Sequence, residues 1–475
     1  MSYIIIDQGT SSTKAFLLNT NGKILHSDKA KYSLQRPRPF HVECDPKTIL
    51  IDIQRLFYEM MFLSKEEKVT GAGIAFQRST FLFWEKSTCK PITPAISWQD
   101  SRATKVLGKY KKYEKKLWNI TGTPLSAHFG GPKFIHMVEN NEMLKGRIKN
   151  NELYFGPLSA FITHAITGKP AIDESIAGRT LMYNLRKGRW SRFATNLFNV
   201  PNNCLPPITP VKHDYGTIFD SKIRLLSIIG DQQAALIGQN GLKKDSIGTN
   251  FGTSASIQYN AGPKPMNVKG LISSVLYSDN KSKMFMVEGT INACNALFYH
   301  LESVLSIPHE RMRWDERIKN TMTKGIFVPG FNGISAPYWK TGFDDIYVDL
   351  DSNPNQIIRA GMESIGYLMN DILNCLQSAG MKIPKTLTAS GGAARPVLLQ
   401  FISSLTKIKI GYYDVKDRTA IGVYKILSGQ YSNKFDKVEN LKSFMPKHLP
   451  HELNKKIKWD KTLIDAKIKN DYSDI

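Results

Sequence analysis

The chain has 475 residues, of which 41% are hydrophobic, so it is too long for one hydrophobic core and two or three domains are expected. Its five cysteines stand singly, which excludes a disulfide framework or a cysteine-rich zinc site, and the absence of a membrane-spanning apolar run predicts a cytoplasmic protein. The formal net charge is +23, but the lysines are spread over the whole chain without a nucleic-acid-binding signature, so we expect neither a nucleic-acid nor a membrane partner.

The first 80 residues combine strand signals with one helix signal. The predicted strands are Tyr3–Ile6, Ala15–Asn19, Lys23–Ser27 and Ala72–Phe76. Asn21-Gly22 is typical of a two-residue hairpin turn between the second strand and the third. Asp45-Pro46, an N-cap aspartate before a proline, predicts the start of a helix that ends near Leu63. This order of strands, helix and returning strand predicts an α/β fold.

The middle of the chain, residues 91–210, is rich in aromatic residues and proline and is predicted to be less regular. Insertions of this kind often carry specificity. After it, a strand is predicted to end at Gly230 and a helix to begin at Asp231. The second half restarts near Ser246, and we expect a compact hinge near residue 240 because no low-complexity linker separates the halves.

The last third carries clear boundary signals. A long helix with one apolar face is predicted after Asn353-Pro354, and it stops at Gly380. The strand Thr386–Ala389 leads through a glycine-rich turn to a helix that begins at Pro396. The lysine-rich tail after Lys434 is predicted to form peripheral helices.

The segment Gly-Thr-Ser occurs twice, each time after an apolar, strand-like run, at Gly9–Ser11 and at Gly252–Ser254. Glycine allows a tight turn, and the hydroxyls and backbone N–H groups that follow it can donate to phosphate oxygens. A third glycine-rich turn, 391–394, also follows a strand. Each turn alone is ordinary turn chemistry. The three in this order predict a duplicated fold whose halves bind one polyphosphate from both sides.

Two aspartates stand at predicted strand ends. Asp231 begins a helix, where the helix dipole favours a carboxylate that can accept the proton of a substrate hydroxyl during phosphoryl transfer. An N-cap aspartate without catalytic function has the same sequence context. Asp7 precedes the first Gly-Thr-Ser turn and suits Mg²⁺ held through water, with an Asx-turn residue as the alternative.

A second group of polar and aromatic residues follows strand-like segments in the first half. Arg78, Trp98 and Asp100 together describe a pocket for a polyhydroxyl compound, because an indole stacks on C–H faces while a guanidinium and a carboxylate bind hydroxyls. A core tryptophan beside a surface ion pair is the alternative.

Together, these segments resemble the FGGY family of carbohydrate kinases, in particular its glycerol kinase branch. The resemblance rests on Asp7–Lys14, Gln77-Arg78, Gly230–Ala235, Phe251–Thr253, Ala336–Trp339 and Ser390–Ala393. It covers nearly the whole chain and implies two actin-like (ribonuclease-H-like) domains with a nucleotide cleft between them. Residues 1–242 would hold the acceptor and the catalytic aspartate, which matches Asp231, and residues 243–475 would hold the nucleotide. The implied cofactors are ATP and Mg²⁺.

The resemblance also implies roles for individual residues. Those matched to phosphate contacts are Thr10, Ser11, Ser12, Lys14, Gly252 and Thr253, with Lys14 in place of the usual arginine of glycerol kinases. Those matched to the adenine-side loop are Gly391, Gly392 and Ala393. Those expected to contact the acceptor are Arg78, Ser79, Trp98, Asp100, His128 and Gln232.

Three positions around the acceptor depart from the glycerol kinase pattern. Ser79 stands in place of a glutamate that holds glycerol hydroxyls, His128 in place of a tyrosine, and Ser256 in place of a phenylalanine. Trp98 is kept, and the run Trp98–Arg102 looks more like xylulokinase. These changes predict an acceptor bulkier than glycerol.

The sequence therefore predicts an ATP-dependent kinase that phosphorylates a hydroxyl of a sugar or polyol and that can form a homodimer. Glycerol kinase itself is the alternative within this class. A second alternative is a catalytically weak, kinase-like binding or regulatory protein. The basic surface favours it, as do Asn295 and Tyr299, which replace a glycine and a glutamine near the adenosine.

Overall fold

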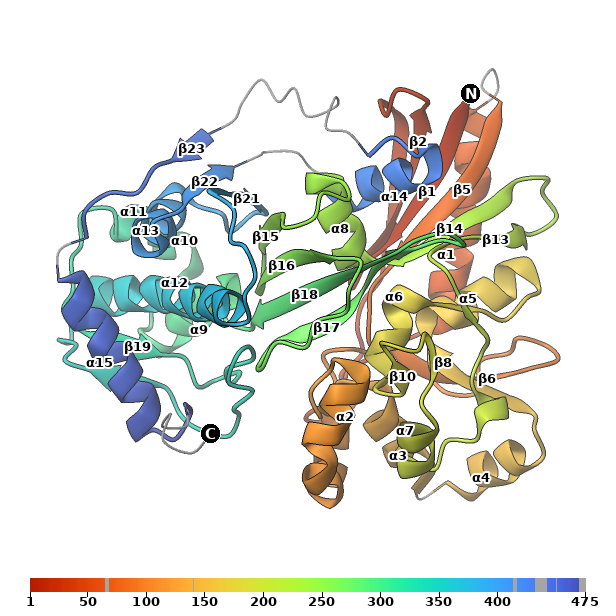
Figure 1. The fold of residues 1–475 in the computed structure, drawn as a ribbon, viewed down its shortest axis with the longest axis horizontal. Coiled ribbons are helices and arrows are strands. Elements are labelled where there is room, and N and C mark those ends of the chain that lie inside the picture. The colour runs from red at the N-terminus through yellow and green to blue at the C-terminus, as the bar shows by residue number, and fades with distance from the viewer. Residues whose placement is uncertain (65–67, 140, 413–416, 432–441, 450, 470–475) are drawn as a thin grey trace.

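Two large β-sheets, one in each half of the chain, form the framework of the protein in the computed structural model (Figure 1). The structure describes residues 1–475 apart from 65–67, 140, 413–416, 432–441, 450 and 470–475. Helices flank both sheets, so the predicted α/β class is confirmed. Within the described ranges, no helix combines the length and the apolar character that a bilayer span needs.

The N-terminal sheet has six strands in the order β13-β14-β5-β1-β2-β3. Its strands are β1 (Ser2–Gln8), β2 (Ser12–Asn19), β3 (Ile24–Lys31), β5 (Val69–Phe76), β13 (Lys212–Thr217) and β14 (Arg224–Gly230). β5 is parallel to both β1 and β14. Successive side chains of β1 point to opposite faces, so Ile4 and Ile6 pack in the core shared with helix α1 (Pro46–Leu63), and Ile5 packs in the core on the other face. Because both faces of β1 are covered, its sequence is a continuous apolar run rather than an alternation of apolar and polar residues.

The C-terminal sheet has seven strands in the order β17-β18-β16-β15-β21-β22-β23. They are β15 (Ile247–Phe251), β16 (Ala255–Gly262), β17 (Ile272–Ser278), β18 (Lys283–Ile291), β21 (Thr386–Ser390), β22 (Lys409–Tyr412) and β23 (Lys442–Phe444). β15 forms a hairpin with β16 and is parallel to β21, as β1 forms a hairpin with β2 and is parallel to β5. A helix, α1 or α12 (Pro354–Ser378), separates the hairpin from the parallel strand in each half. The predicted duplication is therefore confirmed by the topology.

Helix boundaries follow the local signals. The carboxylate of Asp45 accepts from the backbone N–H of Lys47 at the start of α1, and the amide oxygen of Asn353 accepts from the N–H of Asn355 at the start of α12. α12 ends two residues before Gly380, whose φ of 76° a glycine adopts without strain. The predicted helix at Pro396 is α13 (Pro396–Thr406). These predictions are confirmed.

The middle of the chain is more regular than predicted. It contributes two strands, β7 (Ala95–Ile96) and β8 (Leu153–Pro157), to a four-stranded sheet, β4-β7-β6-β8, whose other strands are β4 (Glu43–Cys44) and β6 (Phe81–Glu85). The helices of this region are η1 (Arg102–Tyr113, a 3₁₀ helix), α2 (Glu114–Thr121), α3 (Gly130–Glu139), α4 (Glu142–Lys149), α5 (Leu158–Thr167), α6 (Glu174–Ala177), η2 (Gly178–Thr180) and α7 (Arg192–Leu197). The aromatic residues form its core, where the rings of Phe83 and Phe155 lie 4.9 Å apart. The elements are too short to leave a periodic pattern in the sequence.

Short elements complete the structure. In the middle of the chain they are β9 (Ile172–Asp173), β10 (Tyr183–Asn184), β11 (Arg189–Trp190), η3 (Asn202–Cys204) and β12 (Ile208–Thr209). In the second half they are α9 (Asn295–Val304), α10 (His309–Met312), α11 (Trp314–Arg317), β19 (Ile326–Val328) and β20 (Ile346–Val348).

The tail was predicted as peripheral helices, and its described part is more integrated than that. β23 pairs with β22 at the edge of the C-terminal sheet. Helix α15 (Glu452–Asp465) buries Trp459, whose ring stacks on Tyr367 of α12 at 5.2 Å. A buried tryptophan contributes about 3 kcal/mol or more to stability, so α15 belongs to the core rather than to a solvated rim.

Two helices, one from each half of the chain, cross with their backbones in close contact. α8 (Asp231–Asn240) belongs to the first half and α14 (Arg418–Ser428) to the second, yet α14 lies on the face of the N-terminal sheet (Figure 1). A Cβ atom on Gly422 would lie 1.9 Å from the carbonyl oxygen of Ala234, and one on Gly238 would lie 2.1 Å from that of Arg418. Only glycine fits at these two positions, so the halves are joined by a tight crossing rather than by a linker.

We expect Gly422→Ala to destabilise the protein, because the added methyl group meets a backbone oxygen that cannot move without shifting α8. Overpacking of this kind costs about 1–3 kcal/mol. Urea unfolding measures the effect. Gly146→Ala is the matched control: Gly146 lies in α4 with nothing within 4 Å of its added Cβ, so alanine should be neutral or stabilising there. Equal stability of the two variants would contradict the steric argument.

Candidate active site

Three parallel strands bring the predicted catalytic residues to one edge of the N-terminal sheet. Asp7 in β1 and Ile229 in β14 both pair with Ala75 of β5, so the carboxyl ends of the three strands lie level. Asp7 is the residue before the last of β1, Arg78 follows β5, and Asp231 follows β14. Carboxyl ends of parallel strands are where α/β folds bind ligands.

Asp231 is the first residue of α8, directly after Gly230 at the end of β14. Its Oδ1 lies 3.4 Å from Nε of Arg78 and accepts from the backbone N–H of Gln232 at 2.7 Å. Burial raises the pKa of Asp231, and the Arg78 charge offsets this in part. A buried carboxylate with a raised pKa is a stronger base than an exposed one, and the side chain keeps 24% of its surface exposed, enough to meet a substrate hydroxyl.

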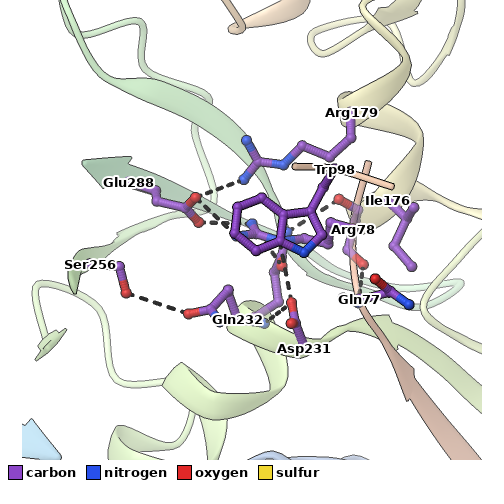
Figure 2. A network of polar contacts seen from close by, with 12 residues as sticks. Gln77, Arg78, Trp98, Ile176, Arg179, Asp231, Gln232, Ser256 and Glu288 are labelled. Carbon is purple, nitrogen blue, oxygen red and sulfur yellow. Dashed lines mark hydrogen bonds and ion pairs between the residues drawn. The ribbon is translucent and has the colours of Figure 1, made fainter. Parts of the chain in front are cut away.

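Arg78 is held by Glu288, a residue that the sequence reasoning missed. Figure 2 shows Arg78 and Arg179 converging on the Glu288 carboxylate. The two Arg78 nitrogens donate to the two carboxylate oxygens at 2.8 and 3.0 Å, and Arg179 donates at 3.1 Å. Glu288 lies in β18 of the second half, whereas both arginines belong to the first half. The triad therefore joins the two halves beside Asp231.

The electrostatics of this triad keep all three groups charged. Burial alone would raise the pKa of Glu288, but Arg179 and Arg78 together lower it to about 2. Burial and the neighbouring Arg78 lower the pKa of Arg179 to about 10, so it remains a cation at neutral pH. The signal that could have identified Glu288 is a lone charged residue in the apolar strand run 284–291.

Gln232 and Ser256 form a polar wall on the other side of Asp231. The Gln232 amide oxygen accepts from Nε2 of Gln258 at 2.6 Å and from Oγ of Ser256 at 3.4 Å. Gln232 comes from α8, and the other two residues come from β16 of the second half. Side chains from both halves therefore surround the Asp231 carboxylate.

Trp98 and His128 lie next to the first Gly-Thr-Ser turn. The Trp98 indole N–H donates to the Thr10 hydroxyl at 2.9 Å, and 37% of Trp98 remains exposed. A His128 ring nitrogen lies 2.8 Å from the Trp98 carbonyl oxygen. Burial and the nearby Lys133 charge lower the pKa of His128, so its imidazole is neutral at physiological pH. The structure thus brings predicted acceptor and phosphate residues together.

Asp100 and Ser79 are both buried. The Asp100 carboxylate accepts from the Arg102 guanidinium and from the backbone N–H of Val42, which leaves it fully buried. Ser79 directly follows Arg78 and has a φ of 63°, an uncommon value for a residue other than glycine. The structure does not bring the Asp100 side chain to the group around Asp231, so its role as an acceptor contact stays a prediction.

The first Gly-Thr-Ser turn closes the β1–β2 hairpin, where the N–H of Gly9 donates to the Ser12 carbonyl at 3.0 Å. Thr10, Ser11 and Ser12 lie in or next to this turn. Lys14 donates to the carboxylate of Asp417 at 2.7 Å. Asp417 is the residue before α14, so this contact also links the two halves.

The second Gly-Thr-Ser turn and the 391–393 turn are in direct contact. The N–H of Ala393 donates to the Phe251 carbonyl at 3.0 Å, and Gly391, with a φ of 102°, lies so close that a Cβ would be 2.2 Å from the same oxygen. The Gly252 and Thr253 carbonyls accept from the first backbone N–H groups of α9. These contacts place Gly252, Thr253, Gly391, Gly392 and Ala393 around one spot at the carboxyl ends of β15 and β21.

Asp7 is the predicted metal residue. Burial and repulsion from Asp231 raise its pKa to about 7, while Lys14 lowers it in part. Two carboxylates held near each other at strand ends favour a hard cation between them, and their oxygen donors suit Mg²⁺. Among the described side chains, no set of three or more acidic, histidine or cysteine groups is arranged to hold a metal ion. Water and phosphate oxygens would complete the shell.

Comparisons with known proteins decide the family. The model of the FGGY family of carbohydrate kinases, N-terminal domain, matches residues 2–238, and that of the C-terminal domain matches residues 248–427. This chain belongs to the FGGY family of carbohydrate kinases. As an FGGY kinase it is a phosphotransferase that acts on an alcohol group of a sugar or polyol, and members of the family use ATP as the phosphate donor.

The FGGY kinase resembles its relatives over almost its full length. It is 31% identical to the glycerol kinase of Caldanaerobacter subterraneus subsp. tengcongensis, with 88% of this chain and 87% of the relative covered. It is 30% identical to that of Borreliella afzelii, with both chains fully covered. The crystal structure of Plasmodium falciparum glycerol kinase with ADP is 25% identical, with a TM-score of 0.86 and 98% of each chain covered. The two-domain, actin-like architecture that the sequence predicted is confirmed.

Proposed function

We propose that this FGGY kinase transfers the γ-phosphoryl group of Mg·ATP to a hydroxyl of a sugar or polyol larger than glycerol, with Asp231 as the general base. The placement of Asp231 beside Arg78, at the carboxyl ends of β1, β5 and β14, supports this assignment most directly. We further propose that residues 1–242 carry the acceptor site and residues 243–475 the nucleotide site. Assembly as a homodimer stays a prediction that the mass in solution tests.

In this mechanism, Asp231 accepts the proton of the acceptor hydroxyl. The hydroxyl oxygen forms a bond to the γ-phosphorus, the bond from that phosphorus to the β–γ bridging oxygen breaks, and ADP leaves with the electron pair. Mg²⁺, when bound, neutralises charge on the phosphates. Arg78 orients the acceptor and keeps Asp231 ionised. The backbone N–H groups and hydroxyls of residues 10–12 and of Thr253, together with Lys14, bind the phosphate oxygens, and Gly252 lets the turn approach them closely.

The polar wall made by Gln232, Ser256 and Gln258 supports an acceptor with more than three carbons. Its groups hydrogen-bond to one another, and Ser256 among them stands where the resemblance to glycerol kinases implies a phenylalanine. Further hydroxyls of a longer acceptor would exchange hydrogen bonds with these groups. A three-carbon acceptor would not make these additional hydrogen bonds, each of which contributes about 0.5–1.5 kcal/mol.

Glycerol is the second candidate acceptor, and the relatives favour it, because those reported above are named glycerol kinase. The alternative of a catalytically weak binding protein is not favoured by the site. Asp7, Asp231 and both Gly-Thr-Ser turns are present and arranged around the strand ends.

A panel of acceptors separates these candidates. With purified protein, ATP and Mg²⁺, we expect a five- to seven-carbon ketose, polyol or sugar acid to exceed glycerol in kcat/KM by about tenfold or more. Chelation by EDTA should abolish turnover, and added Mg²⁺ should restore it. Glycerol as the best acceptor, with a low KM, would overturn the larger acceptor and support the second candidate.

A further inference from the structure

One buried cation in the first half has no part in the proposed phosphoryl transfer. Lys133 lies in α3 and is fully buried. Its ammonium group donates to three backbone carbonyl oxygens: that of Ser97 at 2.7 Å, that of Ser79 at 2.8 Å and that of Ile96 at 3.4 Å. Burying a charged amine costs free energy that a methionine at the same place would avoid, so these contacts indicate a specific use.

The carbonyls that Lys133 binds belong to two turns that present acceptor residues. Ser79 directly follows Arg78, and Ser97 directly precedes Trp98. The two turns come from different strands, since one follows β5 and the other follows β7. The turn at Ser79 has the left-handed φ of 63°, which a non-glycine residue keeps only when its surroundings hold it. One ammonium group therefore connects the backbone beside Arg78 to the backbone beside Trp98.

We propose that Lys133 is a positioning residue that sets the separation of Arg78 and Trp98 and thereby the shape of the acceptor pocket. The proposal rests on the proposed function in assigning these two side chains to the acceptor. Lys133 itself is fully buried, so it has no exposed surface with which to contact an acceptor or a nucleotide.

Among the described residues, the direct hydrogen-bond partners of the Lys133 ammonium are the three carbonyl oxygens, and no carboxylate forms an ion pair with it. Asp100 is the nearest anion, but its carboxylate is taken by Arg102 and by the backbone N–H of Val42. Arg102 repels the ammonium, whereas the Cys44 thiol on β4 and Asp100 favour it. His128 faces it as a neutral imidazole, and the ring of Phe81 lies 5.6 Å away.

The protonation of Lys133 gives the pocket a pH dependence. Burial lowers the pKa of Lys133 to about 7, with Asp100 opposing this and Arg102 adding to it. The protonated amine offers three N–H donors for the three carbonyls, and the neutral amine offers two. As the pH rises through about 7, one carbonyl loses its donor, and acceptor KM should rise.

The effect on stability has the opposite sign. The pKa of Lys133 falls from an ordinary value of 10.5 to about 7 on folding, so between these values the unfolded chain holds a proton that the folded chain has released. The contribution of Lys133 to stability therefore rises from pH 7 to pH 10.5. If Lys133 only stabilised the fold, acceptor binding would not weaken between pH 7 and pH 10.5, because stability rises over that range. The proposed positioning role predicts that acceptor binding weakens there.

The test compares Lys133→Met with Lys455→Met. Lys455 is the matched control, because it is a buried lysine of α15 that binds a backbone carbonyl, that of Thr323, at 2.8 Å and a carboxylate, far from Asp231. Both variants leave buried carbonyl oxygens without their donor, and we expect this loss to exceed the gain from removing a buried charge, so both should lower the melting temperature. Only Lys133→Met should raise acceptor KM, by tenfold or more, with the KM for ATP within twofold of wild type. It should also remove the rise of acceptor KM above pH 7.

Hydrogen exchange provides a measurement that does not depend on turnover. Lys133→Met should speed exchange of the backbone amides in residues 77–80 and 96–100, and Lys455→Met should not. Wild-type protection of both segments in Lys133→Met, or an acceptor KM within twofold of wild type, would overturn the proposal. If wild type phosphorylates no acceptor of the panel, the proposed function fails, and the exchange measurement still decides whether Lys133 holds the two turns. A Lys133→Met chain too unstable to purify is replaced by Lys133→Gln, which should give smaller changes of the same direction.

Discussion

Asp231→Asn should reduce kcat by about 10²–10⁴-fold with little change in the fold, because an amide cannot accept the proton of the acceptor hydroxyl. The substitution keeps the size of the side chain, and an asparagine can accept the same backbone N–H of Gln232 that Asp231 accepts now. Steady-state turnover of the best acceptor of the panel measures the loss, and the melting temperature measures the fold.

Asp45→Asn is the control for this variant. Asp45 also stands at the start of a helix, α1, and its carboxylate accepts from the N–H of Lys47. Asparagine is an equally good N-cap, so Asp45→Asn should keep both stability and turnover. If Asp231→Asn turns over within a few-fold of wild type, the assignment of Asp231 as the base is wrong.

Glu288→Gln should have the largest combined effect on stability and acceptor binding. It leaves Arg179 without its ion-pair partner and Arg78 with Asp231 alone, at 3.4 Å, and breaking a buried pair in this way costs about 3–5 kcal/mol. Arg78 should then lose its orientation, so that kcat/KM for the acceptor falls further than stability alone explains. Urea unfolding and steady-state kinetics on the soluble fraction measure the two effects.

Glu363→Gln is the control that separates the loss of stability from the loss of acceptor kcat/KM. Glu363 is a buried carboxylate of α12 that pairs with Arg359 and Lys455, away from the strand ends. It should lose a similar amount of stability and keep the kcat/KM of wild type. Equal kinetic losses in the two variants would show that Glu288 acts through stability only.

The pH dependence of stability gives an independent check on Glu288. Its pKa falls from an ordinary value of 4.5 to about 2 on folding, so the folded protein holds the charged form more strongly than the unfolded chain does. Stability from this group is fully present above pH 4.5 and is lost as the pH falls toward 2. The stability of Glu288→Gln should change less with pH over this window than that of wild type.

Local signals in the sequence determined the class of the fold and the centre of the site. Each of these signals is contained in a few consecutive residues: the N-cap and proline pairs at Asp45 and Asn353, the glycine turns after apolar strands, and the aspartates at the ends of β1 and β14. Backbone conformation depends first on such neighbours, so these predictions needed no knowledge of distant contacts. The middle of the chain was predicted less well, because its strands of two to five residues are too short to show a period.

Only the tertiary structure decided which charges meet around the site. Glu288 pairs with Arg78 across 210 positions of the chain, and Lys14 pairs with Asp417 across 403. Lys133 binds carbonyls 36 to 54 positions away, which carry no side-chain signal at all. Such partners depend on the order of strands in two sheets and on the crossing of α8 and α14. Electrostatic partners are chosen by distance in space, whereas a sequence pattern reports only distance along the chain.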